Sequence, residues 1–212
     1  MGPFFAIGFG TELIYSFVII VCSMMIYFAT KEMYELSEYK GIKYFRSAFL
    51  FFAVAYFFRS VLKYLFFLSD MYVPHIFGLI GLLVFIYAST MAIFYLLYSV
   101  MTKKWNGKKI YLFHAGAFFV AIISVLSRNM FVYLGVNLVL FILVAFIVYI
   151  AYKKSRNSLY AIYLLLFAFW IFNIIDILLP RFLELFQLLI YMISSGIFLL
   201  ILYKVLRKVG SD

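Results

Sequence analysis

The chain has 212 residues, of which 68% are hydrophobic and 12% are charged, and its formal net charge is +10. Soluble domains are about 45–50% apolar and about 25% charged, so this composition excludes an ordinary soluble domain. Because no soluble core could hide so much apolar surface, we predict an all-α integral membrane protein whose main partner is the lipid bilayer. The longest polar stretch is too short for a soluble domain, which predicts one membrane domain over residues 1–212.

Seven apolar stretches are long enough to cross a bilayer, which requires about 20 residues of helix. In chain order, the predicted spans are roughly 4–30, 47–68, 76–101, 110–127, 130–152, 159–179 and 183–206. The polar stretch KEMYELSEYKGIKYFR (31–46) is predicted to be the loop between the first two spans. Only SRN (127–129) separates the fourth span from the fifth, but their joint length of about 40 residues still requires two passes.

Basic residues gather in alternate loops. The basic segments are 31–46, 102–109, 153–158 and the tail from 204, which together hold 14 of the 18 lysines and arginines. The opposite loops hold only Arg128 and Arg181. Because Lys and Arg accumulate in cytoplasmic loops, this bias predicts an outside N-terminus, a cytoplasmic C-terminus and a location in the cytoplasmic membrane. The net charge is then a topology signal, and we expect no nucleic-acid partner.

Two halves of the sequence resemble each other. The segment PHIFGLIGLLVFIYASTMAIFYLLYSVMTKK (74–104) aligns without gaps with PRFLELFQLLIYMISSGIFLLILYKVLRK (180–208), and Pro74 meets Pro180. Upstream, MMIYFATK (24–31) resembles FIVYIAYK (146–153). We therefore predict a parallel repeat of spans 1–3 and 5–7 with span 4 as a linker, an arrangement seen in transporters. The alternative is that apolar segments resemble one another through composition alone.

The three-one-three layout resembles the plan of sugar carriers, rhodopsins and seven-helix receptors. The resemblance covers only the order of the spans. The sequence contains no Pro-Gln loop signature, and its last span carries no mid-span lysine, since Lys204 lies at the cytoplasmic end. The pattern therefore does not assign the chain to one of these families.

Ionisable and amide side chains within the spans identify a candidate binding site. Ionisable groups inside a membrane are costly and usually face the protein interior or a cavity. Arg59 and Lys63 lie four positions apart, and Asn173 and Asp176 lie three apart, so each pair projects from one face of its helix. Because these groups cluster in the outer half, we predict an outward-opening polar pocket above an apolar plug. The predicted ligand-binding residues are Glu12, Tyr56, Arg59, Lys63, Asn137, Trp170, Asn173 and Asp176.

Several of these residues also have a structural explanation. Arg59, about 14 Å from the outer end of its span, can form an ion pair with a carboxylate and hold no ligand. Lys63 can extend its side chain to the membrane surface, and Asp176 can reach the lipid headgroups. Tyr56 and Trp170 can simply pack in the core of a chain that is 23% aromatic.

No pattern of an enzyme is present. His75 and His114 are predicted at opposite membrane faces, where they cannot share a metal, and the single cysteine, Cys22, lies within an apolar span. The sequence contains neither H-E-x-x-H nor G-x-S-x-G, and no phosphate-binding glycine loop. We therefore expect no enzymatic activity, no metal and no cofactor.

Three functions fit these observations. The first is a receptor or sensor that binds a small polar or anionic ligand and signals to a cytosolic or membrane partner. The second is a small-solute transporter, and the third is a structural or assembly subunit, for which GLIG (78–81) is a weak helix-contact motif. We place the receptor slightly ahead of the transporter because the spans contain no interior proline and the inner half shows few polar residues beyond His114 and Cys22.

Overall fold

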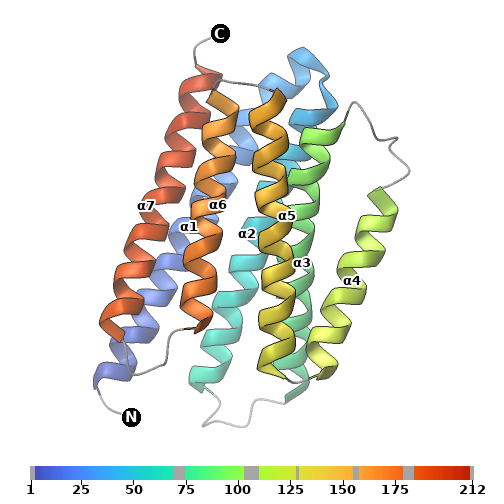
Figure 1. Cartoon of the computed structure of the whole chain (residues 1–212). Helices are drawn as coiled ribbons and strands as arrows, with labels where there is room; N and C mark the ends of the chain where they lie inside the picture. The colour runs from blue at the N-terminus through green and yellow to red at the C-terminus, as the bar shows by residue number, and fades with distance from the viewer. Residues whose placement is uncertain are drawn as a thin grey trace.

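The computed structural model describes residues 3–68, 75–102, 110–127, 129–154, 158–178 and 184–210. Within these residues the chain forms seven α-helices and no strand. The helices are α1 (Pro3–Ser37), α2 (Lys40–Leu68), α3 (His75–Met101), α4 (Ile110–Ser127), α5 (Met130–Lys154), α6 (Ser158–Leu178) and α7 (Glu184–Val209). They run up and down in one bundle, and α1 begins at the end opposite to the one where α7 ends (Figure 1). The predicted all-α architecture is confirmed.

The helices have the length and composition of membrane spans. Among the described residues, α1 to α5 and α7 are long and apolar enough to cross a membrane, whereas the apolar part of α6, Tyr160–Asp176, is shorter. Large apolar side chains such as Phe17, Phe131 and Met192 are exposed on the outside of the bundle. Such a surface would associate in water but matches the hydrocarbon of a bilayer. The multi-pass membrane character is therefore confirmed, while seven crossings stay a prediction.

The predicted loop at 31–46 is wrong. α1 continues to Ser37 and α2 begins at Lys40, so only two residues lie between the helices. The stretch is polar but contains good helix formers, and Lys31 and Glu35 form an ion pair of 3.7 Å one turn apart. Glu38 makes the turn, with a backbone φ of 50°. Apolar periodicity finds the membrane-embedded part of a helix and misses a polar extension beyond it.

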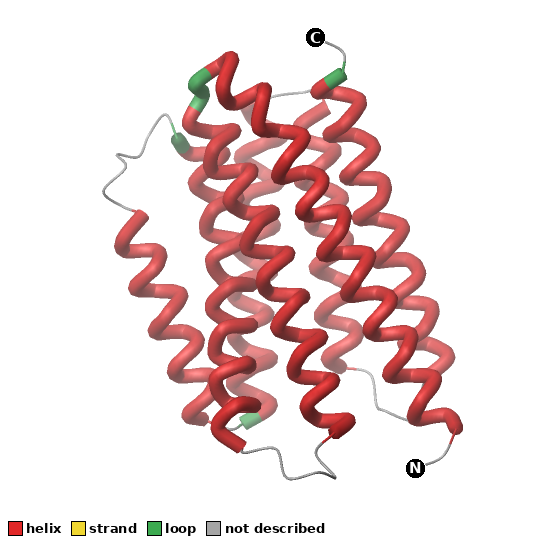
Figure 2. The backbone as a smooth tube through the Cα atoms, turned by 180° about the vertical axis from the view of Figure 1, so that it is seen from behind, coloured by secondary structure: helices red, strands yellow, loops and turns green. Residues whose placement is uncertain are grey.

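The helices form a ring. Each helix contacts the next one in sequence, α7 contacts α1, and α3 also contacts α5. α4 lies at the edge of the bundle, as seen from both sides (Figures 1 and 2). The described parts of α2 and α6 make no backbone contact with each other. Side chains from these two helices therefore fill the space between them, and they meet in the interior.

The middle of the interior is filled by four phenylalanines, here called the phenylalanine plug. Its members are Phe49 and Phe52 from α2, Phe169 from α6 and Phe198 from α7, and all four are buried. The rings of Phe169 and Phe198 lie 4.6 Å apart between centroids in an edge-to-face arrangement, and Phe52 contacts both. Such aromatic pairs add about 0.5–1.5 kcal/mol each beyond the burial of their area. The plug is the packed centre of the bundle.

Some sequence features lie outside the described residues. These are the prolines Pro74 and Pro180, the residues Arg128 and Arg181, and the basic residues of 103–109 and 155–157. The described basic residues of the predicted cytoplasmic segments lie on the ends of α1, α2, α5 and α7 that gather at one end of the bundle.

One histidine attaches α4 to the rest of the bundle. The ring nitrogens of His114 hydrogen-bond to the hydroxyls of Tyr87, at 2.7 Å, and Tyr95, at 3.1 Å, both on α3. The ring also lies against Phe51 of α2. α4 also packs on α3 through small buried residues such as Ala121 and through the ring of Phe113, and the polar contact of His114 adds a directional bond to this packing.

Replacing His114 should loosen α4. We expect His114→Leu to lower the free energy of unfolding by about 1–2 kcal/mol, because two tyrosine hydroxyls lose their partner. Tyr111→Phe is the matched control, since Tyr111 is exposed on the same helix. Thermal unfolding in detergent measures both variants. Equal stability of His114→Leu and the wild type would contradict a stabilising role for the histidine.

Candidate functional site

One face of α2 carries the side chains that build the site. Phe45, Phe49, Phe52, Tyr56, Arg59 and Lys63 recur at alternating intervals of four and three residues. This spacing places all of them on one helix face, which looks toward the interior. Along the stripe the side chains change from apolar to aromatic and then to cationic. The stripe thus leads from an apolar region at the start of α2 to a charged region near its end.

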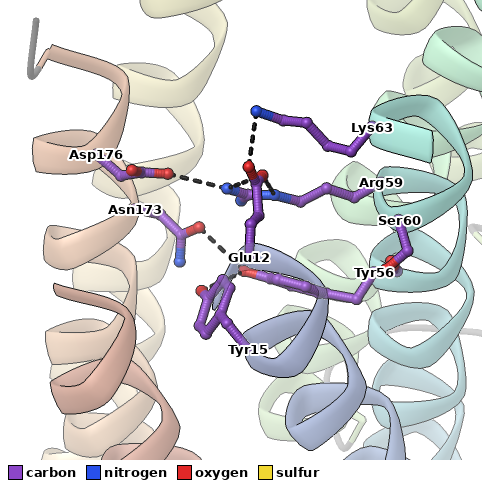
Figure 3. Close-up of polar contacts among 8 residues, drawn as sticks. All are labelled: Glu12, Tyr15, Tyr56, Arg59, Ser60, Lys63, Asn173 and Asp176. Carbon is purple, nitrogen blue, oxygen red and sulfur yellow. Dashed lines mark hydrogen bonds and ion pairs between the residues drawn. The ribbon is translucent and has the colours of Figure 1, made fainter. Parts of the chain in front are cut away.

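A network of ion pairs occupies the charged end of the stripe. Arg59 donates from Nε to Glu12 Oε1 of α1 at 3.1 Å and from Nη2 to Asp176 Oδ2 of α6 at 2.9 Å. Lys63 Nζ lies 2.7 Å from the other oxygen of Glu12. Figure 3 shows the guanidinium between the two carboxylates, with Lys63 on the far side of Glu12 from the Asp176 carboxylate. Arg59 therefore joins α2 both to its neighbour α1 and to α6, which is far away in the sequence.

Uncharged polar groups continue this network. The hydroxyl of Tyr56 donates to Asn173 Oδ1 at 3.0 Å, and it lies 3.0 Å from the hydroxyl of Tyr15 (Figure 3). The guanidinium of Arg59 lies 5.6 Å from the ring centroids of both tyrosines. A cation near aromatic rings is stabilised by the negative electrostatic potential of their faces. Tyr15 was missed in the sequence because a tyrosine in a tyrosine-rich span carries no distinguishing signal.

Burial makes these charges depend on one another. The exposed fraction of the side chain is 7% for Glu12, 11% for Asp176 and 16% for Arg59, but 48% for Lys63. A charge removed from water requires a partner of opposite sign, and the four formal charges sum to zero. One acceptor is left over, since the buried Oδ1 of Asp176 has no hydrogen-bond partner among the described residues.

The network forms a wall of a cavity of about 320 Å³, here called the polar cavity. Its lining residues are Glu12, Phe52, Tyr56, Arg59, Leu62, Lys63, Leu82, Phe85, Ile86, Ser89, Thr90, Tyr133, Val136, Asn137, Leu140, Trp170, Asn173, Asp176, Gln187 and Tyr191. All eight residues predicted as ligand-binding line this cavity, so the structure brings them together. The volume is at the lower end of the usual range for ligand sites, which fits a small molecule.

Three polar residues of the polar cavity were missed in the sequence. Tyr133, Gln187 and Tyr191 line it together with the predicted residues. Gln187 lies close to the start of α7, where a polar residue is ordinary. The two tyrosines are among 19 in the chain, and only their positions in the bundle distinguish them.

A second cavity of about 320 Å³, here called the distal cavity, lies at the opposite end of the bundle. Its lining residues are Thr30, Met33, Tyr39, Gly41, Ile42, Phe45, Ser99, Val100, Ala151, Ile162, Tyr163, Val205 and Lys208. The hydroxyls of Ser99 and Tyr163 lie 2.9 Å apart and join α3 to α6. The expectation that this half of the bundle holds few polar groups besides His114 and Cys22 is therefore wrong. Hydroxyl-bearing residues near predicted span ends look like interfacial residues in the sequence, whereas here they face inward.

The remaining candidates do not contribute to either cavity. Cys22 is buried in the apolar core, and His114 is held by two tyrosines. The side chain of His75 lies outside the described part of the structure. Among the described residues, no group of three or more His, Cys, Asp or Glu side chains is placed to hold a metal ion.

The fold and the site define a multi-pass helical protein of membrane type with a charge-balanced polar cavity. The chain is 34% identical over 212 residues to an uncharacterized protein of Archaeoglobus fulgidus, with 93% of this chain and 92% of the relative covered. It belongs to the same family as that protein. No family model matches the chain, and no solved structure matches it.

Removing the central cation should destabilise the protein. We expect Arg59→Met to lower the free energy of unfolding by about 3 kcal/mol, because the buried carboxylate of Asp176 is left unpaired. The double variant Arg59→Met, Asp176→Asn should recover at least half of this loss, since it no longer buries an unpaired charge. Thermal unfolding in detergent measures both.

Lys63→Met is the comparison for that experiment. Lys63 is half exposed and Glu12 keeps its contacts with Arg59, so the expected loss is below about 1 kcal/mol. A loss for Arg59→Met no larger than that for Lys63→Met would show that the ion pair between Arg59 and Asp176 adds nothing to stability.

Proposed function

We propose that this protein is a transporter of a small polar solute, which binds in the polar cavity. The observation that carries the proposal is the presence of two cavities at opposite ends of the bundle with the phenylalanine plug between them. A carrier requires a binding site that can open toward either side and a barrier that separates the two sides. The two cavities supply the openings, and the plug supplies the barrier.

The same helix faces line both cavities. On α2, Phe45 lines the distal cavity, Phe49 belongs to the plug, and Tyr56 lines the polar cavity. On α6, Tyr163 and Trp170 line the two cavities and Phe169 lies between them. Both cavities thus lie along the same interior faces of α2 and α6, with the plug between them.

The helix contacts support the predicted repeat. In the predicted repeat, α1 corresponds to α5, α2 to α6 and α3 to α7. The contact between α1 and α7 should then have a counterpart between α5 and α3, and both contacts exist. The contacts within α1–α3 likewise have counterparts within α5–α7. The two halves thus share one pattern of helix contacts, which fits a carrier that alternates access by rocking its halves.

Both halves of the chain contribute residues to the polar cavity. The cavity is lined by Glu12 and Tyr56 from α1 and α2, and by Asn137 and Trp170 from α5 and α6. Arg59 of α2 and Asn173 of α6 take part in the same polar network. A binding site at the interface of two repeats is the usual site in such carriers.

Bonds between the halves lie at both ends. Arg59 and Asp176 pair across the halves at the polar cavity, and Ser99 and Tyr163 pair across them at the distal cavity. Rocking that opens one end would break its bonds and keep those of the other. This arrangement provides two alternative closed ends from contacts that already exist.

A receptor is the second candidate, and the polar network supports it. The helices contain no interior proline, and the only proline in a described helix, Pro3, begins α1. A ligand that rearranged the ion pairs of Arg59 could shift α6 against α2 without opening a path, and a separate partner would read that shift. The distal cavity has no role in this mechanism, which is why transport is preferred.

The basic residues give the proposed orientation. The ends of the helices near the distal cavity carry Lys31, Lys40, Lys204 and Arg207. By the positive-inside rule this end faces the cytoplasm, so the polar cavity opens to the outside of the cytoplasmic membrane. The solute would first meet the half-exposed Lys63 on entering.

Removing one phenylalanine ring of the plug should connect the two cavities. We expect Phe169→Ala, in protein reconstituted into liposomes, to raise the leak rate of glycerol at least tenfold over wild type, because the ring that separates the cavities is removed. The measurement is the recovery of light scattering after an osmotic step. Phe49→Ala is the second plug variant, for the case that Phe169→Ala does not fold, since losing a buried ring costs about 3–5 kcal/mol.

Phe119→Ala is the matched control, because Phe119 is exposed on the outside of α4. Thermal unfolding in detergent establishes that the variants are folded. Folded plug variants that leak no faster than the control would contradict a continuous path and leave the receptor as the better function.

A further inference from the structure

The charge balance of the polar cavity restricts its ligand. Of the residues that line it, two are cationic and two are anionic, namely Arg59, Lys63, Glu12 and Asp176. A ligand with a net charge would leave that charge uncompensated in a site largely removed from water, which is unfavourable. A ligand without net charge avoids this penalty. The expected anionic ligand is thus disfavoured, because both cations already have carboxylate partners.

Two hydrogen-bonding positions stay open in the network, and they have opposite polarity. Asp176 uses Oδ2 for Arg59, while its buried Oδ1 accepts no hydrogen bond of good geometry from a described residue, and the nearby Tyr191 hydroxyl is close enough to this carboxylate to compete for it. Lys63 binds one oxygen of Glu12, and an ammonium has three donors. An acceptor is therefore open on α6 and donors are open on α2, with Arg59 between them (Figure 3).

We infer that the solute is a small zwitterion with an ammonium group and a carboxylate, such as an amino acid. This inference rests on the proposed function. The ammonium donates to Oδ1 of Asp176, and the carboxylate accepts from the ammonium of Lys63. Binding in this orientation satisfies both open positions and keeps the site neutral. Arg59 stays between the two carboxylates and holds the side chains of Glu12 and Asp176 in place.

The rest of the cavity fits the body of such a molecule. Trp170, Tyr133 and Tyr191 are aromatic residues of the lining, and aromatic faces attract ammonium groups. Leu82 and Ile86 add apolar surface from α3. A volume of about 320 Å³ admits a small molecule with a short hydrocarbon side chain.

The test measures dissociation constants from thermal-shift titrations of the purified full chain in detergent. The probes are the twenty amino acids and glycine betaine, together with single-charge analogues: for leucine, isoamylamine lacks the carboxylate and 4-methylpentanoate lacks the ammonium. Glucose and glycerol are uncharged probes. At least one zwitterion should bind ten times or more tightly than each analogue that lacks one of its charges.

The variants assign the two ends of the ligand. Asp176→Asn and Lys63→Met should each weaken the binding of the zwitterion about tenfold or more, because each removes one charge-assisted hydrogen bond. Lys43→Met is the matched control, since Lys43 is an exposed lysine of α2 far from the polar cavity, and it should leave binding unchanged. Lys63 is half exposed, so its variant stays informative if Asp176→Asn does not fold.

The remaining outcomes separate this inference from the proposed function. Binding of a singly charged or uncharged probe that equals or exceeds that of every zwitterion overturns the zwitterion and leaves solute binding intact. Zwitterion binding that neither variant weakens overturns the assignment of the two ends. If no probe of any class shifts the unfolding transition, both the zwitterion and the binding site itself are contradicted.

Discussion

The interior of this bundle depends on one cation that must be neutralised away from water. Arg59 is mostly buried, and its guanidinium lies between Glu12 of α1 and Asp176 of α6. A guanidinium has donors in a planar fork and cannot lose its charge, so a buried arginine requires carboxylates within hydrogen-bonding distance. This requirement fixes the relative positions of α1, α2 and α6. Tyr15 and Tyr56 add to it by placing their rings beside the cation.

The polar site and the apolar packing are built from the same helix faces. The interior stripe of α2 passes from Phe45 through the phenylalanine plug to Arg59, so a single helix face meets both cavities and the barrier. Close packing of aromatic rings makes the plug a barrier that polar solutes cannot enter without displacing side chains. The bonds that join the two halves lie outside the plug, at the cavities. In the transport that we propose, relative motion of the halves exchanges polar bonds at the ends around a common apolar centre.

Much of the candidate site could be predicted from the sequence, since an ionisable residue within a span has few acceptable surroundings. Arg59 and Asp176 were found in this way, and the structure places them in contact. The distal cavity could not be predicted, because Ser99 and Tyr163 are unremarkable residues for a span end. Hydroxyls can satisfy themselves on the backbone of their own helix, as Ser99 does with the carbonyl of Leu96, so their presence implies no pocket. The distal cavity exists because the ends of several helices direct their side chains toward the same interior space.

The sequence by itself determined the all-helical membrane class, the approximate positions of the apolar helices and the helix faces that carry charge. These follow from hydropathy and from the helical period, both of which are local properties. The tertiary structure decided which charges meet, because Glu12, Arg59 and Asp176 lie on three helices and local periodicity does not set how those helices are rotated and offset. It also decided that the polar stretch at 31–46 is helical and that a second cavity exists. Both result from packing between helices and from backbone hydrogen bonds, which hydropathy does not measure.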